Sequence, residues 1–208
     1  MSNPEGRPFV SRGGEKLDAA LRHFGLDVTG KVCADLGSHV GGFVDCLRQH
    51  GAARVFSVDT AYGVLAWKLR KDPRVVVLER TNAMHVELPE PVDLVTIDVG
   101  WTPQAKVLPR VATLLKPGGH VITLIKPHYE APPERLRGGV LTPDAAEEVL
   151  GSVLHAVKTL GWSVQGTLPS PLLGHGGNRE YLALLEPAAP DAREAPGAIP
   201  RRRSEPQP

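Results

Sequence analysis

Cysteine is scarce in this sequence, because only Cys33 and Cys46 among the 208 residues carry a thiol. Their spacing fits neither a metal-binding motif nor a disulfide framework, so we interpret both as buried thiols. Two of the eight histidines, His39 and His175, lie in predicted loops from which they could contact a ligand. The other six show no ligand spacing: His23, His50, His85, His120, His128 and His155. We therefore predict that the protein has no metal site.

Long hydrophobic runs are also missing, and no apolar or amphipathic stretch predicts a segment that spans a bilayer or lies on one. The first seven residues lack the apolar core of a secretory signal. These absences argue against a membrane-lytic function and predict a cytoplasmic protein without a membrane partner. Hydrophobic residues make up 41% and charged residues 23% of the chain, as in a soluble globular protein.

The sequence has no excess of charge of one sign, since the formal net charge is only +1. Bulk charge therefore does not identify a nucleic-acid-binding protein, although basic clusters near both ends permit one. The length fits one domain with a single sizeable core. We expect an N-terminal arm over 1–11, a folded domain over 12–186 and a disordered Pro/Ala/Arg tail over 187–208.

Strands and helices alternate along the rest of the chain. Apolar runs predict strands over 32–36, 54–59, 75–78, 92–98, 121–125, 162–168 and 180–185. Helical spacing and caps predict helices over 13–24, 42–49, 63–70, 102–115 and 142–160, with a turn over 116–119 and a loop over 127–139. This alternation predicts an α/β fold, a mostly parallel seven-stranded sheet with helices on both faces.

The first strand ends in a glycine-rich turn, Asp35-Leu36-Gly37-Ser38-His39-Val40-Gly41-Gly42-Phe43. Glycines let the backbone approach a ligand closely, and the first N–H groups of the next helix have no intrahelical partners. Asp59 ends the second strand about 20 residues later, where a carboxylate reaches ribose hydroxyls in nucleotide-binding α/β folds. Such a turn also occurs where it only packs a helix against a strand.

Charged residues close two further strands, with Asp98 at the end of 92–98 and Lys126 after 121–125. The carboxyl ends of parallel strands share one edge of the sheet, so these two residues should face the same crevice as Asp35 and Asp59. An antiparallel last strand would bring Glu180 to that edge as well. A buried ion pair between Asp98 and Lys126 is the structural alternative.

The order Lys16, Asp98, Lys126, Glu180 resembles the Lys-Asp-Lys-Glu tetrad of the FtsJ-like ribose 2′-O-methyltransferases. The flanking sequence motifs are similar to those of the hemolysin A/TlyA-type branch, which methylates ribosomal RNA. This similarity covers about residues 11–186. Members of that branch carry a small N-terminal RNA-binding (S4-like) domain, which we expect this chain to lack. The matching motifs include Ser11-Arg12-Gly13-Gly14-Glu15-Lys16-Leu17, Tyr62-Gly63, Leu65-Ala66-Trp67, Glu79-Arg80-Thr81-Asn82, Lys126-Pro127 and Gly177-Asn178-Arg179-Glu180-Tyr181.

The resemblance implies a Rossmann-like class I methyltransferase fold, S-adenosyl-L-methionine as cofactor, and RNA as partner, either ribosomal RNA or a ribosomal subunit. It implies that Lys16, Asp98, Lys126 and Glu180 are catalytic. It also implies a set of cofactor-binding residues: Asp35, Gly37, Ser38, Gly41, Gly42, Phe43, Asp59, Asn82 and Asp98.

Several alternatives stay open at this level. Lys126 can accept the proton of a ribose hydroxyl if its amine is neutral, or align that hydroxyl if it stays charged. Trp101 can stack on a base or pack in the core. The whole chain can be an RNA- or ribosome-binding protein with little catalysis. A nicotinamide-dependent oxidoreductase is a weaker alternative, because the turn lacks Gly-x-Gly-x-x-Gly.

Overall fold

The computed structural model describes Gly6 and residues 8–188, so most of the predicted tail and part of the predicted arm lie outside the described residues. The described chain forms one sheet of seven strands: β1 (Val32–Leu36), β2 (Arg54–Val58), β3 (Val75–Leu78), β4 (Val92–Ile97), β5 (Leu115–Ile125), β6 (Trp162–Pro169) and β7 (Tyr181–Pro187). The helices are α1 (Arg12–Phe24), α2 (Gly42–Gln49), α3 (Trp67–Arg70), α4 (Gln104–Ala112), α5 (Pro127–Glu130) and α6 (Pro143–Thr159), with 3₁₀ turns η1 (Pro133–Arg135) and η2 (His175–Gly177).

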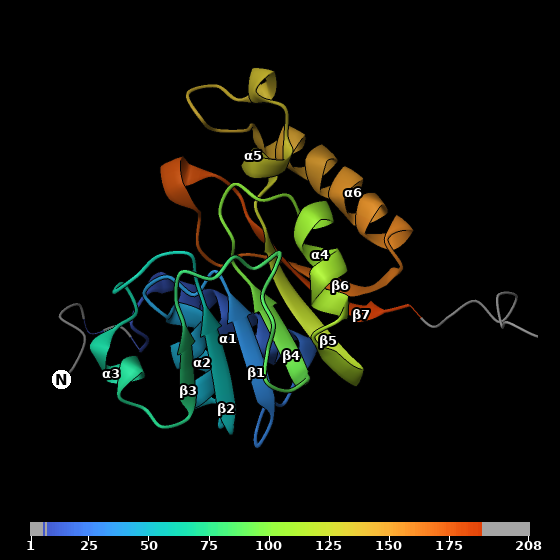
Figure 1. Ribbon diagram of the computed structural model, residues 1–208. Coiled ribbons are helices and arrows are strands. Elements are labelled where there is room, and N and C mark those ends of the chain that lie inside the picture. Colours follow the sequence, from blue (N-terminus) through green and yellow to red (C-terminus); the bar gives the residue numbers. More distant parts are fainter. Residues whose placement is uncertain (1–5, 7, 189–208) are drawn as a thin grey trace, which may run out of the picture.

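The strand order is β3-β2-β1-β4-β5-β7-β6, and β7 runs antiparallel to both of its neighbours (Figure 1). The remaining neighbouring pairs are parallel. This confirms the predicted α/β fold with a mostly parallel sheet. The order reverses between β1 and β4, which is where ligands bind in sheets of this type.

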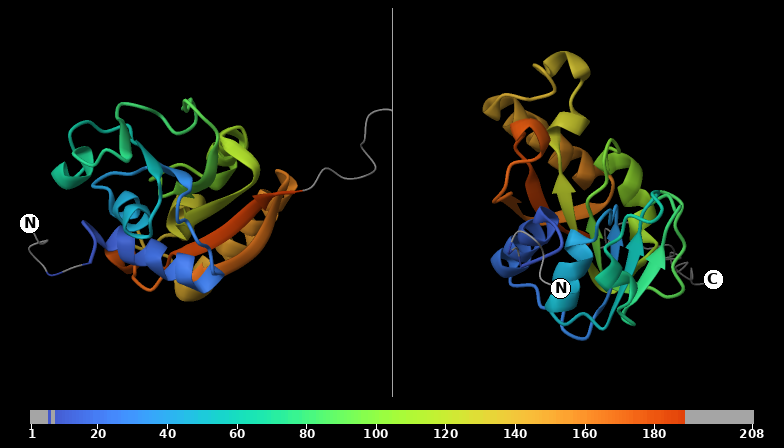
Figure 2. Two further views of the ribbon diagram at one scale, coloured as in Figure 1. Left: turned by 90° about the horizontal axis from the view of Figure 1, so that it is seen from below. Right: turned by 90° about the vertical axis from the view of Figure 1, so that its left-hand side faces the viewer.

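Two apolar cores lie on opposite faces of the sheet, as the helix patterns require. On one face, α1 and α2 lie side by side (Figure 2). Helix α2 packs against β1 and β2, and α1 packs against β7 and β6, with residues such as Leu17, Leu21 and Leu47 in this core. On the other face, α4 and α6 cover the sheet with Val107, Val111, Val149 and Val157. Among the described residues, no helix is both long and apolar enough to cross a bilayer.

Three predicted elements differ in the structure. The helix over 63–70 is limited to α3, because Gly63 has φ +77° and Ala66 is extended. The helix over 102–115 is limited to Gln104–Ala112, since Pro103 is extended. The predicted turn over 116–119 lies inside β5, where the register slips between its pairing with Val92 and with Leu94. Here the Pro-Gly-Gly signal marks an irregularity within a strand.

Two segments expected to be irregular are more ordered than predicted. The loop over 127–139 contains α5 and η1. Within the expected loose arm, Phe9 is buried and packs over Gly14, and the N–H of Val10 donates to Asp45 Oδ2 at 2.9 Å. Phe9 therefore belongs to the core under α1 and α2.

Candidate active site

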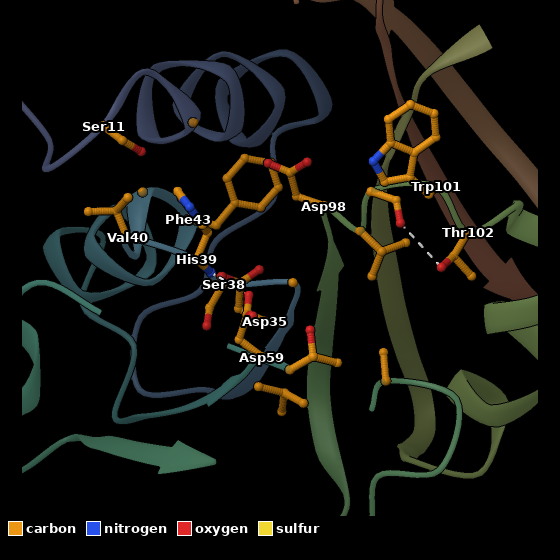
Figure 3. Close-up of a pocket in the computed structure, with 18 of the residues that line it drawn as sticks. Ser11, Asp35, Ser38, His39, Val40, Phe43, Asp59, Asp98, Trp101 and Thr102 are labelled. Carbon is orange, nitrogen blue, oxygen red and sulfur yellow. Dashed lines mark hydrogen bonds between the residues drawn. The ribbon is translucent and has the colours of Figure 1, made fainter. Parts of the chain in front are cut away.

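A cavity of about 730 Å³ opens at the carboxyl edge of β1, β2, β4 and β5 (Figure 3). Figure 3 shows the acids Asp35, Asp59 and Asp98 around this cavity, with Trp101 across from the turn that carries His39 and Val40. Ten of the residues proposed for the site line it: Lys16, Asp35, Gly37, Ser38, Gly42, Phe43, Asp59, Asn82, Asp98 and Lys126. Gly41 and Glu180 do not line it.

The glycine turn is shaped by close contacts with its surroundings. Gly37 has φ +87°, and a Cβ there would lie 2.6 Å from the carbonyl oxygen of Asp98. Gly41 has φ +98°, and a Cβ there would clash with Leu69, so this glycine serves the packing of the turn against α3. A side chain at Gly42 would clash with Ser11. The turn therefore fixes the end of β4, the start of α1 and α3 relative to one another.

Asp59 connects the second strand to the glycine turn. Its carboxylate accepts hydrogen bonds from the N–H of His39 and the N–H of Ala61, both at 2.7 Å. Each oxygen keeps a further lone pair that can accept from a ligand. Asn82 is exposed on the same side, and its Oδ1 accepts from the N–H of Met84 at 2.9 Å.

Asp35 is buried, and only one of its carboxyl oxygens has a partner among the described residues. Thr96 Oγ1 donates to Oδ1 at 2.7 Å, while the buried Oδ2 has no hydrogen-bond partner. Burial raises the pKa of Asp35 to about 8, and the nearby charges of Asp98 and Asp59 add to this rise. A buried carboxyl oxygen without a partner at the wall of a cavity is suited to a hydrogen bond with a ligand.

The four tetrad residues form two ion pairs. Lys126 Nζ lies 2.6 Å from Asp98 Oδ1 and donates to the carbonyl oxygen of Val99 at 3.3 Å. Lys16 and Glu180 form the second pair, in which both side chains are buried. The predicted alternative of an Asp98–Lys126 ion pair is therefore present, but the pair faces the cavity, with 15% of Lys126 and 26% of Asp98 exposed.

The loop before β7 holds Glu180 against Lys16. Gly174 packs on the Glu180 carboxylate so closely that a Cβ would overlap Oε1. Asn178 donates from Nδ2 to the carbonyl oxygen of Gly139 at 2.9 Å and accepts from the N–H of Leu141 at 3.1 Å. The sequence pattern predicted no role for Gly174 or Asn178, although Asn178 lies in the same family motif as Glu180.

Trp101 lies on the rim of the cavity, with 82% of its surface exposed. The predicted alternative of core packing is therefore wrong for this residue. Its backbone is left-handed, with φ +59°, and its ring lies 4.4 Å from that of Tyr129. A left-handed tryptophan is uncommon, and such conformations cluster at functional sites.

One group of side chains of metal-ligand type lies outside the cavity, between α1 and α2. Ligand atoms of Asp18, Cys46 and His50 lie within 4.8 Å of one another. His50 Nε2 lies 2.8 Å from Asp18 Oδ1, and Arg22 pairs with the other oxygen of Asp18 at 3.0 Å. Asp18 and His50 thus have protein partners, and burial raises the pKa of the Cys46 thiol, which disfavours the thiolate that binds metals.

With this strand order the chain has the Rossmann-like fold of the S-adenosylmethionine-dependent methyltransferases. A solved structure with this fold is the Aeropyrum pernix fibrillarin with natively bound S-adenosyl-L-methionine, which matches with a TM-score of 0.59 at 19% identity, over 84% of this chain and 76% of that chain.

Residues 9–186 match the model of the FtsJ-like methyltransferase family, and the chain belongs to that family. It is 40% identical to TlyA of Mycobacterium tuberculosis, named a 16S/23S rRNA (cytidine-2′-O)-methyltransferase, over 92% of this chain and 73% of that protein. It is also 40% identical to Bacillus subtilis YqxC, described as a candidate rRNA methyltransferase, over 85% of this chain. The match spans 65% of YqxC, slightly less than two thirds of its length.

A solved structure of a candidate hemolysin from Streptococcus thermophilus matches with a TM-score of 0.84 at 37% identity, over 89% of this chain and 70% of that chain. The predicted resemblance to the FtsJ-like family and its hemolysin A/TlyA-type branch is thereby confirmed.

Proposed function

We propose that this chain is an S-adenosylmethionine-dependent RNA methyltransferase that methylates a ribose 2′-hydroxyl of ribosomal RNA. The observation that carries the proposal is the Lys126–Asp98 ion pair, which faces the same cavity as the glycine turn. Membership of the FtsJ-like family supports it, as does the activity for which the TlyA relative is named. Ribosomal RNA as substrate, within a ribosomal subunit or free, also favours a cytoplasmic location.

The residues of the cavity fit the cofactor. A volume of about 730 Å³ is in the range of sites for molecules of that size. The turn from Gly37 to Phe43 would hold its methionine part, where Asp35 Oδ2 lacks a hydrogen-bond donor. Asp59 would accept from its ribose hydroxyls, and Asn82 would lie near its adenine. When bound, S-adenosylmethionine supplies an electrophilic methyl group on a sulfonium.

Lys126 would position the ribose hydroxyl for attack on that methyl group. A lysine ammonium has three N–H donors, and two contacts, to Asp98 and to the Val99 carbonyl oxygen, use two of them. The third donor is available for the hydroxyl oxygen. Because the contacts to Asp98 and to the Val99 carbonyl oxygen fix the position of Nζ at the cavity, the geometry supports alignment of the hydroxyl by Lys126.

The second ion pair would complete the site. Lys16 lines the cavity and is buried, so its charge requires Glu180 as a partner. The exposed ring of Trp101 beside the site would stack on a base of the RNA. Both lysines lie beside the cavity as cations where an RNA phosphate or hydroxyl would approach.

The test is incubation of the purified protein with methyl-labelled S-adenosylmethionine and ribosomal RNA, followed by nucleoside analysis. Label in a 2′-O-methyl nucleoside supports the proposal. RNA binding without transfer of label would favour the alternative of a binding protein that keeps the cofactor fold. Label on a base would refute the ribose as acceptor.

A further inference from the structure

Two exposed aromatic rings lie close together in the chain beside the cavity, outside the site described above. Tyr62 is 68% exposed and Trp67 is 70% exposed. Val64, between them, is exposed as well. Large apolar side chains that gather on a surface in this way mark an interaction site more often than scattered ones do.

A cation lies over each of these rings. Arg80 Cζ is 4.5 Å from the centroid of the Tyr62 ring, and Lys71 Nζ is 4.8 Å from the centroid of the Trp67 ring. The four residues Tyr62, Trp67, Lys71 and Arg80 are called the aromatic–cation patch below. In each pair the cation covers one face of the ring, so the opposite face can receive a further flat group.

The two cations differ from the basic residues around them. Lys68 pairs with Asp45, Arg70 with Glu79, and Arg74 with Asp72. Within the described part of the chain, neither Lys71 nor Arg80 has a carboxylate partner within 4.0 Å. Their charge is thus uncompensated by an acid, which favours an anionic partner.

The backbone under the patch is held in place by hydrogen bonds. Arg80 has the left-handed φ of +54°, and its N–H donates to the carbonyl oxygen of Ala61 at 3.3 Å. Glu79 Oε1 accepts from the N–H of Gly63 at 2.7 Å and pairs with Arg70. A strained residue that is held by its surroundings in this way is typical of a functional surface.

Tyr62 and Arg80 follow the carboxyl ends of β2 and β3, at the same edge of the sheet as the cavity, and Trp67 and Lys71 lie at the two ends of α3, which connects these strands. Thr60 and Thr81, close to Tyr62 and Arg80 in the chain, line the cavity. The strand order β3-β2-β1-β4 puts the ends of β2 and β3 two and three strands from the end of β4, which is roughly 10–15 Å at the usual strand spacing (Figure 1). Trp101 follows β4, so the cavity separates it from the patch.

We propose that the aromatic–cation patch binds a single-stranded segment of the RNA that flanks the target nucleotide, an inference that rests on the proposed function. Bases would stack on the open faces of Tyr62 and Trp67, and phosphates would bind Lys71 and Arg80. Exposed rings combined with unpaired cations match the chemistry of RNA, which presents flat bases and negative phosphates together. A protein partner would need acidic groups at both cation positions.

The test compares the Tyr62→Ala/Trp67→Ala double variant and Arg80→Ala with the wild-type chain. The probe is a fluorescein-labelled single-stranded RNA of mixed sequence, titrated at several salt concentrations. We expect the double variant to bind on the order of ten-fold more weakly or worse. Arg80→Ala should lower the slope of log affinity against log salt by about one. The affinity for S-adenosylmethionine should stay at the wild-type value.

Arg54→Ala is the matched control, because Arg54 is exposed, pairs with Glu90 and begins β2 at the opposite edge of the sheet. It should leave the RNA affinity unchanged. Thermal melts check that each variant is folded. Wild-type RNA affinity in the folded double variant would overturn the proposal, as would equal losses for Arg54→Ala and Arg80→Ala.

Methyl transfer by the wild-type chain, assayed on ribosomal RNA, separates this inference from the proposed function. If the wild type transfers methyl groups and the double variant binds RNA normally, only the proposed role of the aromatic–cation patch fails. If the double variant and Arg80→Ala weaken binding but the wild type transfers no methyl group, the proposed catalysis fails and the RNA surface stands.

Discussion

Lys126 Nζ lies 2.6 Å from Asp98 Oδ1, at the ends of the adjacent parallel strands β5 and β4. The same two strands carry a second lysine–aspartate pair at the other edge of the sheet, where Lys116 Nζ lies 2.9 Å from Asp93 Oδ2. Only the first pair faces the cavity. The structure therefore offers a pair proposed to be catalytic and a matched pair outside the cavity.

Lys126→Ala should lower the rate of methyl transfer by on the order of 10²-fold, because the hydroxyl loses the group that positions it. Binding of S-adenosylmethionine, measured by calorimetry, should persist. Lys116→Ala is the control and should keep the wild-type rate. A Lys126→Ala variant with full activity would remove this lysine from the mechanism.

Gly174→Ala should lower methyl transfer more than about ten-fold, because the new methyl group displaces the Glu180 carboxylate from Lys16. It should also destabilise the fold by about 1–3 kcal/mol, since a buried ion pair is disturbed and the loop is overpacked. Gly151→Ala, in α6 with open space around it, is the control and should be neutral or stabilising. Chemical denaturation and a transfer assay measure both effects. Unchanged activity in Gly174→Ala would show that the Lys16–Glu180 contact is dispensable.

Asp35 should make the folded protein less stable as the pH rises from about 4 to about 8. Its pKa is raised to about 8 in the folded state from 3.8, so across this interval the folded chain keeps a proton that the unfolded chain loses. The stabilisation that protonated Asp35 contributes is complete below its unfolded pKa of 3.8 and is lost as the pH rises through its folded pKa of about 8. Asp35→Asn removes the titration.

The measurement for Asp35 is the difference in unfolding free energy between the wild type and Asp35→Asn across that pH range. We expect the wild type to lose more than about 1 kcal/mol relative to the variant between the two ends of the range. A difference that stays constant with pH would show that Asp35 ionises normally in the folded chain.

Trp101→Ala should raise the KM for RNA about ten-fold, because a base loses its stacking platform, while the affinity for S-adenosylmethionine is retained. Trp101→Phe should keep most of the function, since the ring is preserved. Leu160→Ala, at the exposed end of α6, is a control for the removal of a large exposed side chain. Steady-state kinetics with ribosomal RNA measures the effect, and an unchanged KM in Trp101→Ala would exclude stacking there.

The sequence predicts well which strand ends and which turn form the site, because these features depend on local sequence pattern. Apolar runs that end in Asp98 and Lys126 identify two strand ends, and the rule for parallel sheets brings these ends to one edge. The glycine turn and Asp59 are placed in the same way. These inferences need only strand direction and order, which short connections largely determine.

Side-chain pairing could not be predicted in the same way. Whether Lys16 pairs with Glu180 or Asp98 depends on the loop before β7, and that loop is positioned by Gly174 and Asn178 through contacts far apart in the sequence. The residues Pro117–Gly119 are typical of a turn, but in the structure they lie inside an irregular part of β5. This placement depends on the pairing of β5 with β4, which the local sequence does not show. Trp101 is a large aromatic residue of a type that often packs in a core, and only the folded structure reveals that its side chain is exposed.

The central claim is tested most directly by mapping ribose methylation in ribosomal RNA from cells with the protein, without it, and with Lys126→Ala in its place. We predict at least one 2′-O-methyl nucleotide that is present with the wild type, absent without the protein, and absent again with Lys126→Ala. Identical ribose methylation in all three would contradict the proposed function.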